Sequence, residues 1–152
     1  MAVIALVTWV VTAGLGFFML ATWVRAGGVR TATAPATATA GADVAGATGH
    51  PAGTRFPPPL VFGHFLLAAT GLVLWIIYLV VDSDALAWVA FVLLVVVAAG
   101  GDVLFLRWYK DRNQSGAQLA EQAIPTAVVY LHGLFAVATI VLVFLVAVGV
   151  GE

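Results

Sequence analysis

Four uninterrupted apolar segments are the feature that most restricts the fold of this chain. They run from about residue 2 to 24, 60 to 81, 85 to 106 and 126 to 148, and consist mainly of Val, Leu, Ala and Phe. A helix needs about 20 residues to cross the hydrocarbon core of a bilayer. The 152-residue chain is 63% hydrophobic and only 9% charged, which is too apolar for a soluble domain. The sequence predicts a single-domain, all-α membrane protein, a four-transmembrane-helix up-down-up-down bundle.

The composition also excludes several kinds of site. The chain has no cysteine, which excludes disulfides, iron–sulfur clusters and thiolate ligation of haem. It has no phosphate-binding loop, no nucleophile–base pair and no acidic pair within the apolar segments. The first segment lacks a basic start and ends in Trp23-Val24-Arg25, a poor cleavage site, so we expect a retained helix rather than a signal peptide. An electron-transfer or accessory membrane subunit is expected rather than an independent enzyme.

The basic residues predict how the chain is oriented in the membrane. All six lie in the two loops at one end of the expected bundle: Arg25, Arg30, Arg55, Arg107, Lys110 and Arg112. The positive-inside rule places these loops in the cytoplasm and both termini outside. The bias towards Ala, Val, Gly and Arg, with a single lysine, is typical of a GC-rich bacterial genome. We therefore expect a bacterial cytoplasmic (inner) membrane protein whose partner is the lipid bilayer and which binds no nucleic acid.

The first of these loops is low in complexity. Residues 31–56 begin with alternating Thr and Ala and continue with a Gly-rich stretch, so this cytoplasmic loop is expected to be mobile. Pro57, Pro58 and Pro59 then lead the chain into the second apolar segment as a stiff, extended element. His50 lies in the loop, where a solvated side chain is expected rather than a ligand.

The other two histidines occupy matching positions in the second and fourth segments. His64 is five residues past Pro59, and His132 is seven residues past Pro125. At 1.5 Å per residue, each lies roughly 7–11 Å inside its helix from the same side of the membrane. Histidine is costly in hydrocarbon and is a frequent axial ligand of haem iron, so this pair is the best candidate site.

Small residues accompany both histidines. Ala68 and Gly71 follow His64 on the same helical face, and Ala136 follows His132. Small side chains there would leave room for a flat macrocycle between the two imidazoles, but they also let membrane helices pack closely. In a square bundle the diagonal is roughly 11–14 Å, which suits two histidines that bind one iron from opposite sides. Trp75, on the same face as His64, is expected in the core.

These positions resemble the bis-histidyl four-helix membrane cytochromes b. The resemblance covers His64 with Ala68 and His132 with Ala136, in two helices that run in the same direction. It implies one haem b with the two histidines as axial ligands of its iron, and electron transfer with a quinone or a partner redox protein, as part of a larger respiratory complex. Those families often hold two haems, whereas this chain has one histidine pair, near the cytoplasmic side. A separate small family of four-helix bacterial membrane proteins would show the same features.

The charged residues near this layer leave several alternatives open. Arg107, with the other basic residues of the rim, is placed to meet haem propionates, although the positive-inside rule alone explains its position. Asp102 lies at about the depth of the histidines. It could accept the Nδ1 proton of one of them, or complete a site with two histidines and one carboxylate for a single transition-metal ion. An ion pair with a nearby arginine would instead make Asp102 structural.

Two further hypotheses assign the chain no haem. In the first it is a cofactor-free structural subunit, in which the histidines are structural and hydrogen-bond across the bundle. Its small residues, Gly14 with Gly16 and Gly100 with Gly101, would contact a larger complex. In the second, the two histidines and Asp102 line an ion or proton pathway, for which a four-helix chain would have to form a homo-oligomer.

Overall fold

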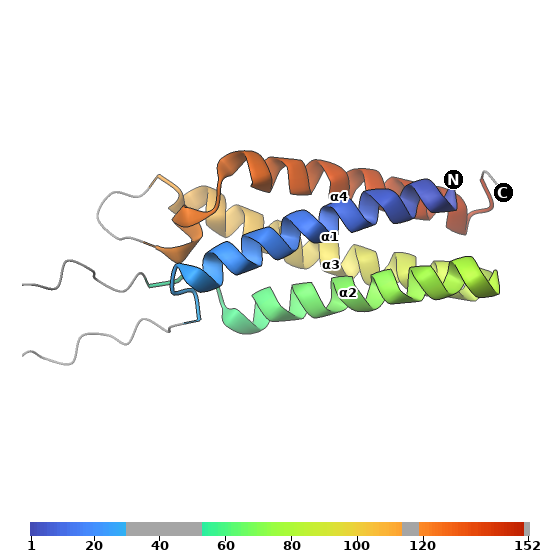
Figure 1. The fold of residues 1–152 in the computed structure, drawn as a ribbon, viewed down its shortest axis with the longest axis horizontal. Helices are drawn as coiled ribbons and strands as arrows, with labels where there is room; N and C mark the ends of the chain where they lie inside the picture. The colour runs from blue at the N-terminus through green and yellow to red at the C-terminus, as the bar shows by residue number, and fades with distance from the viewer. Residues whose placement is uncertain (30–52, 114–118, 151–152) are drawn as a thin grey trace, which may run out of the picture.

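The computed structural model describes residues 1–29, 53–113 and 119–150 and folds them into one bundle of four long helices (Figure 1). The elements are α1 (Ala2–Arg25), α2 (Pro58–Val81), α3 (Asp84–Asp111), the short 3-10 helix η1 (Ala120–Ala123) and α4 (Thr126–Ala147). Each of the four long helices is long and apolar enough to cross a membrane, which confirms the predicted all-α, multi-pass fold. Most of the low-complexity loop 31–56, with His50, lies outside the described residues.

The helix ends follow the local sequence. Two prolines open α2, where the absent N–H groups would be unpaired in any case. Asp82 adopts a left-handed conformation (φ 54°) and turns the chain sharply from α2 into α3. Helix α3 continues to Asp111, five residues past the expected end at Leu106, because hydropathy marks the thickness of the membrane and no Gly or Pro interrupts residues 107–111.

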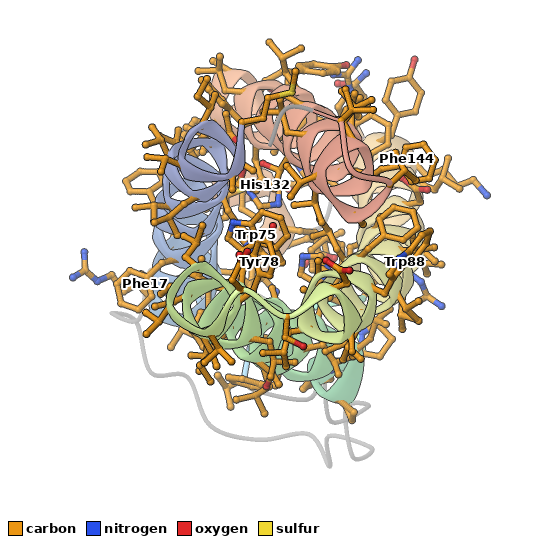
Figure 2. The ribbon with its side chains drawn as sticks, turned by 90° about the vertical axis from the view of Figure 1, so that its right-hand side faces the viewer. Phe17, Trp75, Tyr78, Trp88, His132 and Phe144 are labelled. Carbon is orange, nitrogen blue, oxygen red and sulfur yellow. The ribbon has the colours of Figure 1, made fainter. Side chains whose placement is uncertain are left out.

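The four helices form a square when viewed along the bundle (Figure 2). Helix α1 packs extensively against α4, and α2 against α3, whereas the α1–α2 and α3–α4 contacts are sparser. Helices α2 and α4 are therefore diagonal. Successive helices run in opposite directions, so both termini lie at one end, here named the termini end (Figure 1). The opposite end carries Arg25, Arg55, Arg107, Lys110 and Arg112 and is named the basic end.

Side chains packed at each end of the bundle form two separate apolar cores. The core of the termini end consists of Ala5, Trp9, Trp75, Tyr78, Ala87, Ala90, Leu94, Val143 and Val146. The core of the basic end consists of Trp23, Phe56, Trp108, Ala120 and Ile124. Figure 2 shows Trp75 and Tyr78 pointing into the bundle, and Phe17 and Trp88 at its periphery. The layer between the two cores contains both histidines.

A buried carboxylate organises the segments that close the basic end. Glu121 has no exposed surface and accepts hydrogen bonds from the Thr54 hydroxyl and the Arg55 backbone N–H, both at 2.9 Å. The indole N–H of Trp23 donates to Thr54 Oγ1 at 3.0 Å. The Arg55 guanidinium forms an ion pair with Asp111 at 2.8 Å. The residues before α2 are thereby tied to η1 and to the ends of α1 and α3.

Candidate functional site

The candidate site is a layer in which histidines and glycines alternate around the bundle. Helix α1 contributes Gly16, α2 contributes His64, α3 contributes Gly101 and α4 contributes His132. The two imidazole rings face each other across the bundle with their centres 6.3 Å apart and their planes inclined by 60°. Each glycine lies against the ring of one histidine. We call these four residues the histidine layer.

His64 is held by the helix that follows it in the chain. Its Nδ1 lies 2.9 Å from the backbone carbonyl oxygen of Val97 on α3. A Cβ added to Gly101 would lie only 3.1 Å from His64 Cε1. The imidazole therefore rests directly on the backbone of α3, and a side chain at position 101 would displace it.

His132 is held in the same manner by α1. Its Nδ1 lies 2.9 Å from the carbonyl oxygen of Thr12, and a Cβ added to Gly16 would lie 3.1 Å from its Cε1. Figure 2 shows this ring pointing into the bundle from α4. The two histidines thus have equivalent surroundings, each provided by the helix with which its own helix packs most extensively.

The accepting carbonyl lies four residues before the glycine in both cases: Thr12 before Gly16, and Val97 before Gly101. In an α-helix the carbonyl oxygen of one residue points towards the residue four positions later, to whose N–H it is bonded. A glycine at that later position leaves the carbonyl uncovered, so a side chain from another helix can reach it. Sequence reasoning missed this role, because every residue offers a carbonyl and the spacing alone identifies none.

These hydrogen bonds determine which imidazole nitrogen is free. A carbonyl oxygen can only accept, so Nδ1 of each histidine carries the proton and donates it. Nε2 then keeps its lone pair, and no described residue makes a hydrogen bond to it. An Nδ1–H donated to a backbone carbonyl, which fixes the tautomer and orients the ring, is the usual arrangement of a metal-ligating histidine.

The spacing of the two rings suits a single metal ion between them. A metal–imidazole bond is about 2.0–2.1 Å and the nitrogen lies about 1.1 Å from its ring centre, so two opposed ligands place their ring centres about 6.3 Å apart. The observed separation is 6.3 Å. The described residues contain no group of three or more His, Cys, Asp or Glu side chains that could hold a metal ion. Any ion in this layer would therefore take its remaining ligands from something other than those side chains.

The residues that border the histidine layer are small and only partly buried. Ala68 and Ala136, one turn from the histidines on the same inner face, retain accessible surface, as do Gly16 and Gly101. By contrast Trp75 and Val143, further along the same faces, have none. Small residues thus accompany the two histidines, whereas large side chains fill the core of the termini end.

Three of the predicted site residues lie away from this layer. Gly71 is buried under Trp9, whose ring would lie 3.0 Å from an added Cβ, so it accommodates a core tryptophan and does not border the histidines. Asp102 lies on the exposed face of α3, and both Nδ1 atoms are bonded to backbone carbonyls rather than to this carboxylate. Arg107 is exposed and donates to the Arg55 carbonyl oxygen at 3.3 Å.

The four glycines for which the sequence predicts an external contact have different surroundings in the structure. Gly16 and Gly101 face inward against the imidazoles, whereas a Cβ added to Gly14 would have no neighbouring atom within 4 Å. Gly100 also borders His64, since a Cβ added there would lie 3.7 Å from its Nδ1. The paired glycines therefore serve the histidines and not an outer surface, apart from Gly14.

No family model matches the chain, and no match is found among curated proteins or among solved structures.

Proposed function

We propose that this protein binds one haem b in the histidine layer, with Nε2 of His64 and Nε2 of His132 as the two axial ligands. The observation that carries the proposal is the paired geometry: two imidazoles 6.3 Å apart, each with Nδ1 bonded to a backbone carbonyl and Nε2 free. A porphyrin supplies four nitrogens of its own, so two histidines complete the coordination of its iron. This accounts for a two-ligand site without a third metal-binding side chain among the described residues.

The residues around the pair fit such a group. Gly16, Gly101, Ala68 and Ala136 present no bulky side chain to the layer. The apolar cores at both ends separate it from water, which favours tight retention of an apolar macrocycle and influences its reduction potential. The carbonyls of Thr12 and Val97 raise the basicity of the ligating nitrogens by accepting the Nδ1 protons.

The chemistry that haem supplies is one-electron transfer, and we assign the protein a role as an electron-transfer subunit that works with a quinone or a partner redox protein. The positive-inside rule assigns the basic end to the cytoplasm and the termini to the outside of a bacterial inner membrane. The histidine layer is nearer to the basic end, so the haem would exchange electrons on the cytoplasmic side.

The test is the visible absorption spectrum of the detergent-purified protein before and after addition of dithionite. We expect a Soret band and sharp α and β bands on reduction, with one haem per chain. His64→Ala and His132→Ala should each abolish the low-spin spectrum, and His50→Ala should not. A colourless protein from haem-replete cells would refute the proposal, and elemental analysis of that sample would then detect a bound metal ion.

A further inference from the structure

Two buried N–H groups near the basic end have no acceptor among the described residues. They are the indole Nε1 of Trp108, a residue that is 3% exposed, and the guanidinium Nε of Arg112. A buried donor without an acceptor costs free energy, and in native structures such groups usually face a ligand or water. No other buried side-chain nitrogen or oxygen in the described part of the chain is in this state.

The two donors belong to one cluster. The Arg112 guanidinium lies over the Trp108 ring, 5.3 Å from its centre, and over the Tyr109 ring at 4.6 Å. Its Nη1 donates to the Tyr130 hydroxyl at 3.5 Å. Stacking and this hydrogen bond hold the guanidinium over the face of the indole, so the cation and the neutral donor belong to side chains that contact each other.

Within this cluster, Trp108 is the donor nearer to the histidine layer, and Arg112 follows one turn later at the end of α3. Trp108 is seven residues past Gly101, which is two helical turns, or about 10 Å along α3. Side chains of a helix lean towards its N-terminus, so the indole of Trp108 leans back towards the histidine layer. The partly buried Leu104 and Val129 are packed against the same core.

The two buried carboxylates that the structure describes at this end are already engaged. Asp111 pairs with Arg55, and Glu121 accepts from Thr54 and from the backbone of Arg55. Both carboxylates are thus satisfied by groups other than the two free donors. A ligand could supply the acceptor for these donors, and a cationic donor with a neutral one suits an anionic oxygen.

We propose that Trp108 and Arg112 bind a propionate carboxylate of the haem, and that the haem is therefore held with its propionates towards the basic end. This inference depends on the proposed function. It assigns to this pair the anchoring that the sequence suggested for Arg107, whose guanidinium is exposed and bonded to the Arg55 carbonyl. Charge-assisted hydrogen bonds to a carboxylate are the stronger class of hydrogen bond, so the pair would contribute substantially to retention of the haem.

The experiment combines protein variants with a modified ligand. Apoprotein in detergent is reconstituted with haem b or with haem b dimethyl ester, whose propionates carry no charge, and the affinity for each is measured by absorption titration. Arg112→Gln removes the cation, Trp108→Phe removes the indole N–H, and Lys110→Gln removes an exposed cation two residues away as the matched control.

We expect esterification to lower the affinity of the wild-type protein and of Lys110→Gln by about tenfold or more. Arg112→Gln and Trp108→Phe should bind haem b with a similarly reduced affinity, and should lose little more when the ester is used. Such non-additivity indicates that the residue and the propionate contact each other. Because the ester test leaves the wild-type protein intact, it does not depend on the folding of either variant.

Two outcomes would overturn the inference. Equal affinity of the wild-type protein for both ligands shows that its donors do not meet a propionate. An ester effect that is the same in Arg112→Gln and Trp108→Phe as in wild type places the propionates elsewhere, and bound anionic lipid in that preparation would identify the competing occupant. In both cases the haem still binds, so the proposed function stands; if neither ligand binds, the proposed function itself fails.

Discussion

Alanine at position 16 or 101 should displace one histidine ring and weaken haem binding, although it is the smallest possible change. The added Cβ would lie 3.1 Å from Cε1 of His132 or His64. Carbon atoms in contact are normally about 3.5–4.0 Å apart, so the ring must move by about 0.4–0.9 Å. If it moves away from the glycine, the Nδ1···O distance of 2.9 Å grows beyond the usual limit of about 3.2 Å.

The free energy of unfolding should fall as a result. Overpacking costs about 1–3 kcal/mol, and loss of the imidazole–carbonyl bond about 0.5–1.5 kcal/mol. Alanine regains about 0.5–1 kcal/mol through its higher helix propensity. The net destabilisation is then about 0.5–4 kcal/mol. Loss of the partner that orients a ligand lowers metal affinity by about 10–100-fold.

The matched control is Gly14→Ala, two residues from Gly16 on the same helix. Its Cβ meets no atom within 4 Å, so the same substitution should leave stability unchanged or slightly raised and haem binding unchanged. The measurements are thermal unfolding followed by circular dichroism, and haem affinity from absorption titration. If Gly16→Ala and Gly101→Ala behave like Gly14→Ala in both assays, the imidazoles do not rest on these backbones and the argument is refuted.

Three further predictions test single features of the site and the basic end. His64→Gly should lose the low-spin spectrum and regain it on addition of free imidazole, whereas imidazole should not change the spectrum of the wild-type protein; no recovery would mean that His64 is not a ligand. Asp102→Asn should leave haem stoichiometry and midpoint potential unchanged, because the carboxylate is exposed and the Nδ1 protons are bonded elsewhere; a shifted potential would contradict this placement. Glu121→Gln removes one of the two buried acceptor oxygens, so the free energy of unfolding should fall by about 1.5–3 kcal/mol and the melting temperature with it. Asp84→Asn, at an exposed position at the other end, should leave the melting temperature unchanged. Equal melting curves for the two variants would show that the Glu121 network is not stabilising.

The sequence alone predicted the number of helices, their topology and the shared depth of His64 and His132. Counting from Pro59 and Pro125 places both histidines in one layer, and the contact between their rings agrees with this. These inferences succeed because membrane thickness dictates helix length and the prolines mark where two helices begin. Both signals are present in the order of the residues themselves.

The rotation of each helix about its own axis could not be predicted in the same way. Gly101 and Asp102 are neighbours, but one faces His64 and the other is exposed. In a soluble protein the polar face of a helix would reveal this difference. Helix α3 is apolar on nearly all sides, so its pattern does not report which face is inward, and Asp102 was placed in the site and Gly101 outside it. Gly71, likewise, could not be assigned to Trp9 without the packing of α1 against α2.

The proposed haem would join two halves of the bundle that are otherwise less closely packed. Helices α1 and α4 form one half, with His132, its carbonyl and its glycine, and α2 and α3 form the other, with the equivalent parts for His64. Each ligand is therefore oriented within its own half, but the iron would bond to both. A ligand that bridges the halves stabilises the arrangement in which both histidines reach it.

Removal of haem should then broaden the distribution of distances between the halves and leave distances within a half unchanged. The chain has no cysteine, so spin labels can be attached at introduced cysteines alone. Val10→Cys with Val73→Cys spans the halves, and Val73→Cys with Val92→Cys lies within one, all at positions that are about half exposed (52%, 55% and 56%). Pulsed electron–electron double resonance should show a broader distribution for the first pair in apoprotein than in protein loaded with cobalt(III) porphyrin, which is diamagnetic and binds two axial imidazoles. The distribution for the second pair should be the same in both states. If both pairs respond equally, the ligand orders the whole bundle rather than the junction between its halves; if neither responds, the halves are already fixed by their own packing.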